Sequence, residues 1–483
     1  MIVRDEEKFL GPCLDSVQGV ADEIVVVDTG SGDRTVEIAR EHGAQIIHHP
    51  WGDHFAEARN RALTLARGDF VLQLDADERL DPETRDAIRA AVQRNDFDLG
   101  LLSFIDMDES GRSGRQWQAP RLYRRTPGAR YFGRVHEQVA LDRAEVRRVA
   151  IPATVLHFGY TPALYLSRQK AERSERLLRL ALDDPETQDP ILRANYLYHL
   201  AQLGQGRELL DRFEDYAGFI REQWGAEPPA VPWVSGGLVQ HCILLSDQGR
   251  HLEAVPLASE LLVRYGEAPL LRFVLARAAA AQGDLAAADR ELAEVLRPDA
   301  EPSVEHSLYG GDLALVRSRA HFLQGVLRDW QNRPEEALPH YQSAYGEEPE
   351  QEYFLGAVLC SLVRLGRYAQ ARDLLEGGGV ATAGSRPQLD CLGLALALLT
   401  RSGGRLAFWG TKVRVAAETF PGARRMLERL EEMGSRHCYS IEDFPELRAA
   451  IWSVPDPTRF ALPPTIRKSS LIGTAPRADQ ASG

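Results

Sequence analysis

The chain has 483 residues, of which 44% are hydrophobic and 26% are charged, a composition typical of a globular protein with more than one domain. Its net charge of -13 argues against a nucleic-acid partner, because such a partner requires a concentrated basic face. No stretch approaches the roughly 18 consecutive apolar residues of a membrane span, and the start "MIVRDEE" lacks an apolar core of signal-peptide length. We therefore expect a cytoplasmic protein without an integral membrane segment.

Strand and helix patterns alternate over the first hundred residues. Residues 23–28, "EIVVVD", form a β-branched run typical of a buried parallel strand, and the next segment carries turn glycines, capping residues and a helical pattern up to residue 43. Residues 44–49 predict a second strand, residues 55–68 a helix, and residues 70–74 a further strand. This alternation predicts a parallel α/β sheet.

Acidic residues follow two of these strands. Ligands of such sheets lie beyond the carboxyl ends of the strands, where Asp28 and the pair Asp75 and Asp77 fall. Two carboxylates at a strand exit can hold a hard divalent cation together with diphosphate oxygens. They could also be solvated turn acids in front of a helix. A phosphatase of the haloacid dehalogenase type is disfavoured, because its two acids follow the first strand and precede a Thr or Val where this chain has Arg79.

Three segments in the expected order resemble glycosyltransferase family 2: "MIVRDEEKFLGPCLDSV", "ADEIVVVDTGSGDRTVEIAREHGAQI" and "FAEARNRALTLARGDFVLQLDADE". The resemblance spans residues 1–165 and implies a Rossmann-like α/β domain of the GT-A fold in an inverting enzyme. It also implies a nucleotide-diphosphate sugar as donor, UDP-sugar in particular, and Mn²⁺ or Mg²⁺ as cofactor. Family members usually carry several apolar residues before the counterpart of "MIVRDEE", so a short first strand is expected here.

The resemblance implies roles for the donor side of the site. Asp28 would contact the nucleotide base, and Arg59 with Asn60 would lie near the uracil or the ribose. Asp75 would face the ribose and, with Asp77 beneath the diphosphate, complete a DxD metal motif. The alternatives are a turn acid for Asp28 and exposed helix residues for Arg59 and Asn60.

A second cluster lies in "RLYRRTPGARYFGRVHEQV", residues 121–139. An inverting transfer needs a carboxylate to take the proton of the acceptor, and the resemblance places "HE" at the position of that base. Glu137 is therefore the predicted base, with His136 positioning the base or the acceptor. The alternatives are a surface glutamate paired with a nearby arginine and a structural histidine.

Two further groups are assigned to the leaving diphosphate. Planar guanidinium groups suit phosphate, so Arg121 and Arg124 are predicted to offset its charge. Many GT-A enzymes close the metal site with a histidine from the region of "VLHFGY", which makes His157 a predicted ligand, since neutral imidazole suits manganese. A structural role for His157 is the alternative.

Beyond about residue 165 the sequence is almost wholly helical and contains repeats. A small residue followed five positions later by alanine recurs at Gly249 and Ala254, Gly283 and Ala288, Asn332 and Ala337, and Gly366 and Ala371. The alanines are spaced by 34, 49 and 34 residues, where 34 is the tetratricopeptide period and 49 adds an insert of 15 residues near "DAEPSVEHSLYGGDL". We predict a helical linker or solenoid start over 166–240, an all-α solenoid of tetratricopeptide-like repeats over 241–453, and a disordered tail over 454–483.

This architecture is similar to a bacterial group that includes the sublancin S-glycosyltransferase, which modifies a peptide side chain. A solenoid offers a long surface for an extended chain, so a peptide or protein acceptor is favoured. A glycan or lipopolysaccharide acceptor is the alternative. A different kind of protein also fits, namely a tetratricopeptide scaffold with a degenerate catalytic domain, but the presence of Asp75, Asp77 and Glu137 favours an enzyme.

Overall fold

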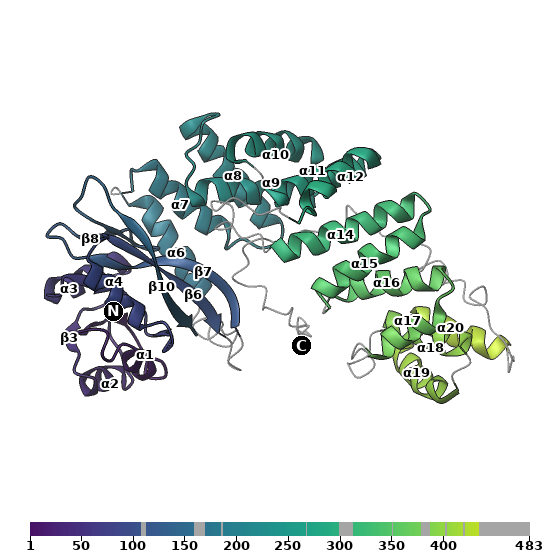
Figure 1. Cartoon of the computed structure of the whole chain (residues 1–483), viewed down its shortest axis with the longest axis horizontal. Helices are drawn as coiled ribbons and strands as arrows, with labels where there is room; N and C mark the ends of the chain where they lie inside the picture. Colours follow the sequence, from purple (N-terminus) through teal and green to yellow (C-terminus); the bar gives the residue numbers. More distant parts are fainter. Residues whose placement is uncertain are drawn as a thin grey trace, which may run out of the picture. The chain divides into compact units, whose positions relative to one another are not determined.

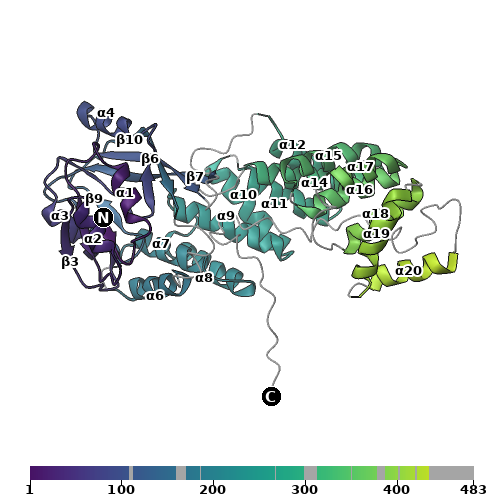
Figure 2. The same ribbon diagram turned by 90° about the horizontal axis from the view of Figure 1, so that it is seen from below.

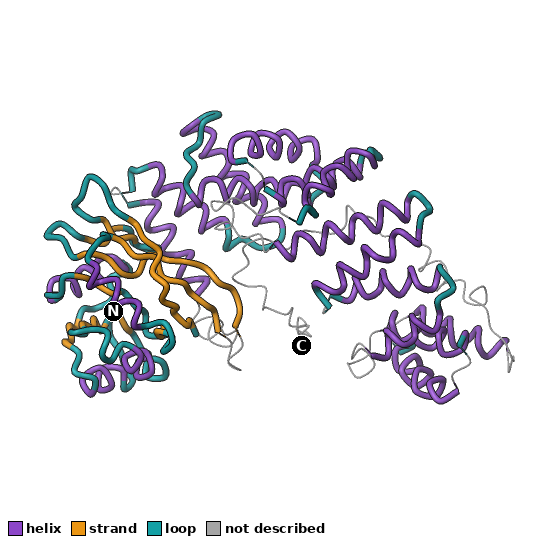
Figure 3. The backbone as a smooth tube through the Cα atoms, in the orientation of Figure 1, coloured by secondary structure: helices purple, strands orange, loops and turns teal. Residues whose placement is uncertain are grey.

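The computed structural model describes residues 1–107, 113–158, 170–184, 187–266, 268–298, 313–349, 351–377, 387–400, 403–418 and 421–433. The chain forms two compact units, one from Met1 to Pro228 and one that begins at Pro229. Figure 3 shows the strands in orange, all within the first unit, while the described part of the second is helical.

A small parallel sheet forms the N-terminal edge of the first unit. It consists of β1 (Ile2–Val3), β2 (Val25–Asp28) and β3 (Gln45–His48), connected by α1 (Leu10–Ser16) and α2 (Thr35–Glu41). All its pairings are parallel, with Ile2 opposite Val27 and Val25 opposite Gln45. The first strand is short, as the sequence predicts, and each connection is the helical crossover that parallel pairing requires.

The larger sheet is mixed, which differs from the purely parallel sheet predicted. Its order is β4-β7-β6-β10-β5, and only β6 and β10 pair in parallel. The strands are β4 (Phe70–Leu72), β5 (Glu78–Leu80), β6 (Leu99–Met107), β7 (Ser113–Arg124) and β10 (Arg148–His157). The long strands β6, β7 and β10 lie side by side in Figure 1. The difference arises because the predicted strand at residues 70–74 pairs antiparallel with β7, which lies far along the chain.

The remaining elements of the first unit surround these sheets. They are α3 (Phe55–Leu65), α4 (Asp86–Arg94), the antiparallel pair β8 (Arg130–Phe132) and β9 (Gln138–Ala140), and the helices α6 (Lys170–Asp183), α7 (Pro190–Ala201) and α8 (Arg207–Trp224). Helix α7 begins in the expected way, because the Asp189 carboxylate accepts hydrogen bonds from the backbone N–H groups of Ile191 and Leu192 at 2.7 and 3.1 Å, with Pro190 in the first turn.

The first compact unit extends beyond the predicted end of the GT-A domain at residue 165. It includes α6, α7 and α8, which the sequence assigns to a linker or solenoid start. The physical reason is a shared core, in which Val135 of the α/β part packs with Leu177 and Leu178 of α6 and Tyr196 of α7. The compact units divide between Pro228 and Pro229, at neither of the predicted domain boundaries, residues 165 and 240. As limits of the family domains, those two boundaries stay predictions.

The described part of the second unit consists of successive helices that pack on their neighbours, and Figure 2 shows them following one another along the chain. They are α9 (Pro232–Asp247), α10 (His251–Tyr265), α11 (Pro269–Ala281), α12 (Leu285–Val295), α14 (Leu313–Trp330), α15 (Pro334–Glu347), α16 (Glu352–Arg364), α17 (Tyr368–Gly377), α18 (Pro387–Leu399), α19 (Gly403–Ala416) and α20 (Pro421–Met433). Most of the predicted insert and all of the predicted tail lie outside the described residues.

The predicted repeat motif is confirmed at all four places. The small residues Gly249, Gly283, Asn332 and Gly366 have φ angles of 72, 79, 57 and 69°, so each reverses the chain between two helices in the left-handed conformation that favours Gly or Asn. The alanines five positions later are fully buried, each at 0% exposure. The alanine of each motif therefore lies in the packed interior of the helical unit.

The same close packing predicts the effect of a substitution in α14. A Cβ at Gly325 would lie 2.5 to 2.9 Å from the ring atoms of Tyr341 in α15. Because the Tyr341 hydroxyl also donates to the Asp329 carboxylate at 2.7 Å, the ring has little freedom to move. We expect Gly325→Ala to lower the free energy of unfolding by about 1–3 kcal/mol, the usual cost of overpacking.

Thermal melting of the purified variant measures this effect, and Gly356→Ala in α16 is the matched control. A Cβ at Gly356 meets nothing within 4 Å, so the control should be neutral or stabilising by about 0.5–1 kcal/mol through helix propensity. Equal melting temperatures for the two variants would contradict the close α14–α15 crossing.

Candidate active site

The acidic turn joins β4 to β5 and is closed by its own residues. The backbone N–H of Glu78 donates to the Asp75 carbonyl at 3.0 Å, and the Glu78 carboxylate accepts from the Asp75 N–H at 2.9 Å. The backbone of Asp77 accepts a hydrogen bond from Phe158, just after β10. The turn therefore presents the two acidic side chains from a fixed backbone between the two edge strands of the mixed sheet.

Arg59 connects the acidic turn to the predicted base. Its guanidinium lies 2.8 Å from Asp75 through Nη2 and forms an ion pair with Glu137 through Nε. The side chains of Arg59 and Glu137 are only 7% and 10% exposed, which contradicts the alternatives of an exposed helix residue and a surface glutamate. Burial alone would raise the pKa of Asp75, but Arg59 and Arg121 outweigh it and hold that pKa well below its usual range. The two arginines therefore favour the ionised form of Asp75.

Arg121 carries a second buried ion pair. Its Nη2 lies 2.6 Å from Glu78 and 3.7 Å from Asp75. Glu78 is 3% exposed, and burial together with the negative charge of Asp75 raises its pKa even though Arg121 opposes the shift. The predicted site residues Arg59, Asp75, Arg121 and Glu137 thus belong to one network, to which the structure adds Glu78. The pattern of β5 hints at Glu78, since it lies on the same face of that strand as the buried Leu80.

Asp77 faces a different partner. Its Oδ2 lies 3.9 Å from Nε2 of His157, and the two side chains are 14% and 12% exposed. Strand register explains the meeting, because His157, the last residue of β10, pairs with Glu78 on one side and with Asp106 of β6 on the other. Nδ1 of His157 lies 2.7 Å from the Asp106 carboxylate. Although burial lowers the pKa of His157, Asp106 and Asp77 together raise it above its usual value.

Asp28 ends β2 and is also buried, at 5% exposure. One carboxylate oxygen accepts from the Ser31 N–H at 3.0 Å, and the other lies 3.0 Å from Nδ1 of His48, the last residue of β3. Burial opposes ionisation, but the hydrogen bonds from Ser31 and His48 outweigh it and lower the pKa of Asp28. Asp28 therefore acts as a turn acid, one of the two roles considered from the sequence. Its predicted contact with a nucleotide base stays a prediction. His48 was not anticipated.

Asn60 and Arg124 make structural contacts away from the acidic turn. The Asn60 amide donates to the backbone carbonyl of Tyr131 at 2.9 Å and accepts from its N–H at 2.8 Å, which fastens α3 to β8. Arg124 lies three residues after Arg121 on β7, but its guanidinium contacts the Asp98 carboxylate and the Phe97 carbonyl instead. The structure does not bring Arg124 to the acidic turn.

The contacts of Arg124 predict a stability role. Its guanidinium donates to the carbonyls of Phe97 and Asn95 at 2.9 and 3.2 Å and lies 3.4 Å from the Asp98 carboxylate. We expect Arg124→Ala to reduce the free energy of unfolding by about 1–3 kcal/mol, the usual worth of hydrogen bonds to a charged group, while nucleotide affinity is unchanged. Melting curves and calorimetric titration with UDP measure both. A large loss of affinity at normal stability would restore the predicted phosphate role.

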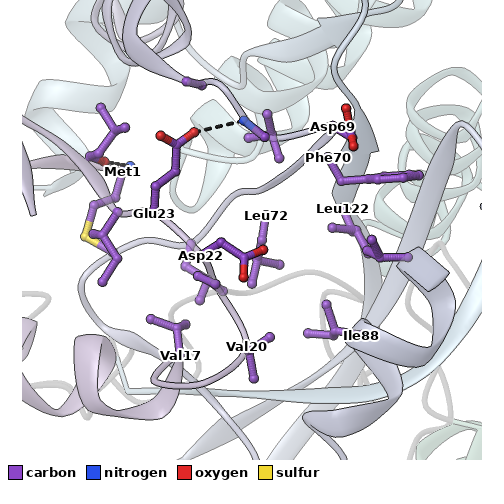
Figure 4. A pocket seen from close by; sticks show the side chains of 18 of the residues that line it. Met1, Val17, Val20, Asp22, Glu23, Asp69, Phe70, Leu72, Ile88 and Leu122 are labelled. Carbon is purple, nitrogen blue, oxygen red and sulfur yellow. Dashed lines mark hydrogen bonds between the residues drawn. The ribbon is translucent and has the colours of Figure 1, made fainter.

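A cavity lined by described residues of the first unit is not part of this site. Its volume is about 310 Å³, and Figure 4 shows apolar residues such as Val17, Phe70 and Leu122 beside the acids Asp22, Glu23 and Asp69 in its lining. Its lining includes Val25 at the start of β2 and all three residues of β4, whereas Asp28 lies at the other end of β2 and the acidic turn follows β4. None of the predicted site residues lines it. The candidate active site is therefore separate from this cavity and consists of buried charged side chains.

Comparison with known proteins agrees with this geometry. Residues 1–140 match the family model for glycosyl transferase family 2. The chain is 33% identical over 279 residues to a TPR repeat-containing protein of Synechococcus elongatus, an alignment covering 49% of this chain and 68% of the relative. It is 25% identical over 236 residues to the SPbeta prophage-derived glycosyltransferase SunS of Bacillus subtilis, covering 46% of this chain and 51% of SunS.

A family 2 glycosyltransferase domain of GT-A type is therefore joined to tetratricopeptide repeats, and the chain belongs to this group of proteins. The chain spans about half of SunS. The structure of S. aureus TarS 1-349 in complex with UDP-GlcNAc covers 58% of this chain and 90% of its own at 17% identity, but the TM-score of 0.29 is too low to carry an argument. No helix in the described ranges is long and apolar enough to cross a membrane.

Proposed function

We propose that this glycosyltransferase is an inverting, metal-dependent enzyme that transfers a sugar from a UDP-sugar to a peptide or protein acceptor. The observation that carries the proposal is the position of Glu137, a buried carboxylate that shares one guanidinium, that of Arg59, with Asp75 of the acidic turn. This arrangement connects the predicted base to the acid predicted on the donor side.

The chemistry assigned to Glu137 is proton removal. The acceptor nucleophile attacks the anomeric carbon on the face opposite the nucleotide, the bond from that carbon to the diphosphate oxygen breaks, and Glu137 takes the proton of the nucleophile. The products are the glycosylated acceptor and the nucleoside diphosphate. Arg59 holds the carboxylate in place and keeps a positive charge beside the acids.

The residues present also fit a divalent metal, which we propose is Mn²⁺ or Mg²⁺. Asp77 and His157 face each other at 3.9 Å with an oxygen and a nitrogen donor, a pair that suits manganese. The second ring nitrogen of His157 is fixed by Asp106, as is usual for metal-bound histidines. Asp75 already forms ion pairs with Arg59 and Arg121, so we propose that it supports the site and does not bind the metal directly.

When bound, such a metal offsets the charge of the leaving diphosphate. The described residues contain no cluster of three or more acidic, histidine or cysteine side chains arranged for a metal ion. A site with two protein ligands that relies on diphosphate oxygens for the others is consistent with this, because Mg²⁺ commonly binds through one or two carboxylates and substrate phosphates.

The repeats support the choice of acceptor. Stacked helical hairpins present an extended surface that suits a peptide chain, and a glycan acceptor remains the alternative. The scaffold hypothesis is disfavoured because the proposed catalytic side chains are present and largely buried. Glu137 pairs with Arg59, and Asp77 faces His157.

The test is a screen of the full chain against nucleotide sugars with different bases and sugars, each with Mn²⁺, Mg²⁺ or EDTA. Thermal shift and release of the nucleoside diphosphate are measured together. We expect a UDP-sugar to stabilise the protein and to be slowly hydrolysed only with metal. Stabilisation without turnover in any condition would favour the scaffold, and no response to any nucleotide sugar would overturn the proposal.

A further inference from the structure

The loop of residues 133–137 joins β8 to β9 and ends at the predicted base. Two of its residues have unusual backbone conformations, since φ is 93° at Gly133 and 52° at His136. A residue with a Cβ rarely adopts this left-handed conformation, and it persists only where the surroundings fix it. The strain at His136 lies one residue before Glu137. The contacts that fix it therefore also fix the base.

Those contacts come from the helical hairpin α6–α7. The ring of His136 stacks on the ring of His199 in α7, with 3.6 Å between the ring centroids and 17° between the planes. Val135 is buried among apolar side chains of the hairpin, including Leu177 of α6 and Tyr196 of α7. Both residues before the base are thus seated on helices outside the α/β sheets.

The first half of the loop is held in the same way. The Arg134 guanidinium pairs with Asp184, just after α6, at 2.9 Å. At Gly133 the hairpin approaches so closely that a Cβ would lie 2.9 Å from the Tyr196 hydroxyl. Four consecutive residues therefore contact the hairpin, each through a different kind of interaction.

A further ion pair ties the hairpin to the opposite flank of the loop. Arg176 of α6 forms two hydrogen bonds with the Asp53 carboxylate, the longer one 2.7 Å. Arg134 donates to the Asp53 carbonyl at 3.2 Å, and its own carbonyl accepts from the N–H of Phe55 at the start of α3. Helix α3 carries Arg59, the partner of Glu137. The hairpin and α3 thus hold the loop from two directions.

We infer that the α6–α7 hairpin is a working part of the catalytic unit and that His199 is a positioning residue for Glu137. The inference rests on the proposed function, because the loop matters for catalysis only if Glu137 is the general base. It extends the catalytic unit beyond the α/β sheets into helices that the sequence pattern places with the solenoid. It also predicts that the stacked ring, rather than the ionisable group of His199, is what the site requires.

The experiment compares His199→Ala with His199→Phe in the full chain. Loss of the ring should lower kcat by about tenfold or more at nearly constant KM for the donor, because small displacements of a catalytic group have large effects on rate. The phenylalanine variant keeps the stack and should recover most of the rate. His42→Ala is the matched control, because His42 directly follows α2 in the same unit and contacts Asp15 and the Ile38 carbonyl instead.

A second measurement is independent of activity. Hydrogen–deuterium exchange of the segment 130–140 should accelerate in His199→Ala and stay near wild type in His199→Phe. If His199→Ala does not fold, Asp184→Asn, which removes the counter-charge of Arg134, should give the same loss of kcat and the same faster exchange.

The outcomes separate the inference from the proposed function. Wild-type kcat and exchange in folded His199→Ala, or equal damage in the alanine and phenylalanine variants, would overturn the positioning role. A wild-type protein that turns over no nucleotide sugar, but whose segment 130–140 loosens in His199→Ala, would sink the proposed transfer while supporting the role of the hairpin in ordering the loop.

Discussion

Replacing Glu137 by glutamine is expected to lower the rate of sugar transfer by about a hundredfold or more, the usual worth of a positioned general base. The amide has nearly the same size as the carboxylate, and its oxygen can still accept the hydrogen bond from Arg59. It cannot take the proton of the acceptor. Because the loss acts on the transition state, kcat and kcat/KM should fall together while nucleotide affinity changes little.

The same substitution also perturbs a buried ion pair, so stability must be measured on the same preparation. Arg59 would keep Asp75 as its remaining close counter-charge, and the melting temperature should fall as well. Rates are therefore compared per folded molecule. Glu57→Gln is the matched control, since Glu57 lies on the same helix α3, is 47% exposed and contacts His49. A stable Glu137→Gln enzyme with near-normal transfer would show that another group is the base.

The sequence predicts features that depend on short-range patterns. The acids follow strands, and the turn residues Gly249 and Asn332 with the alanines after them mark helix crossings, because these signals lie within a few positions of one another. The predicted network around Asp75 also contains the expected Arg59, Arg121 and Glu137. Here the family resemblance supplied the candidates, and the structure shows that they meet.

What the sequence could not predict depends on strand register and on packing between distant segments. The contact of Asp106 with His157 joins residues 51 positions apart and follows from the parallel pairing of β6 with β10. The different contacts of Arg121 and Arg124 also depend on register, because the pairing of β6 with β7 shifts at Arg121, where β7 has one extra residue. Such an irregularity has no signal in the sequence.

The C-terminal limit of the first compact unit could not be predicted from the sequence either. The change from alternating to helical periodicity near residue 165 is a local property, whereas the limit of a compact unit is set by shared core contacts. Val135 and Tyr196 lie 61 positions apart and pack in one cluster. No local pattern in the sequence predicts that these two residues are in contact.

Removal of the Asp77 carboxylate is expected to abolish the metal-dependent component of nucleotide binding. In wild type, UDP should bind more tightly with Mn²⁺ or Mg²⁺ than with EDTA, because Asp77 and His157 would hold the proposed metal, which would offset the charge of the diphosphate. Loss of an outer partner of a metal ligand commonly costs about 10–100-fold in metal affinity, so loss of a ligand itself should cost about a hundredfold or more. Calorimetric titration of UDP into Asp77→Ala, with and without metal, measures this directly.

Two further variants make the Asp77 result specific. Asp81→Ala is the matched control, because Asp81 lies four residues later and its carboxylate accepts from the N–H of Glu83. It should leave the metal response intact. Asp106→Asn keeps both proposed ligands but weakens the hold on His157, which is 2.7 Å away, and should give an intermediate loss. Metal-dependent affinity in Asp77→Ala equal to that of wild type would remove Asp77 from the metal site, whereas a loss in Asp106→Asn alone would leave His157 as the ligand that matters.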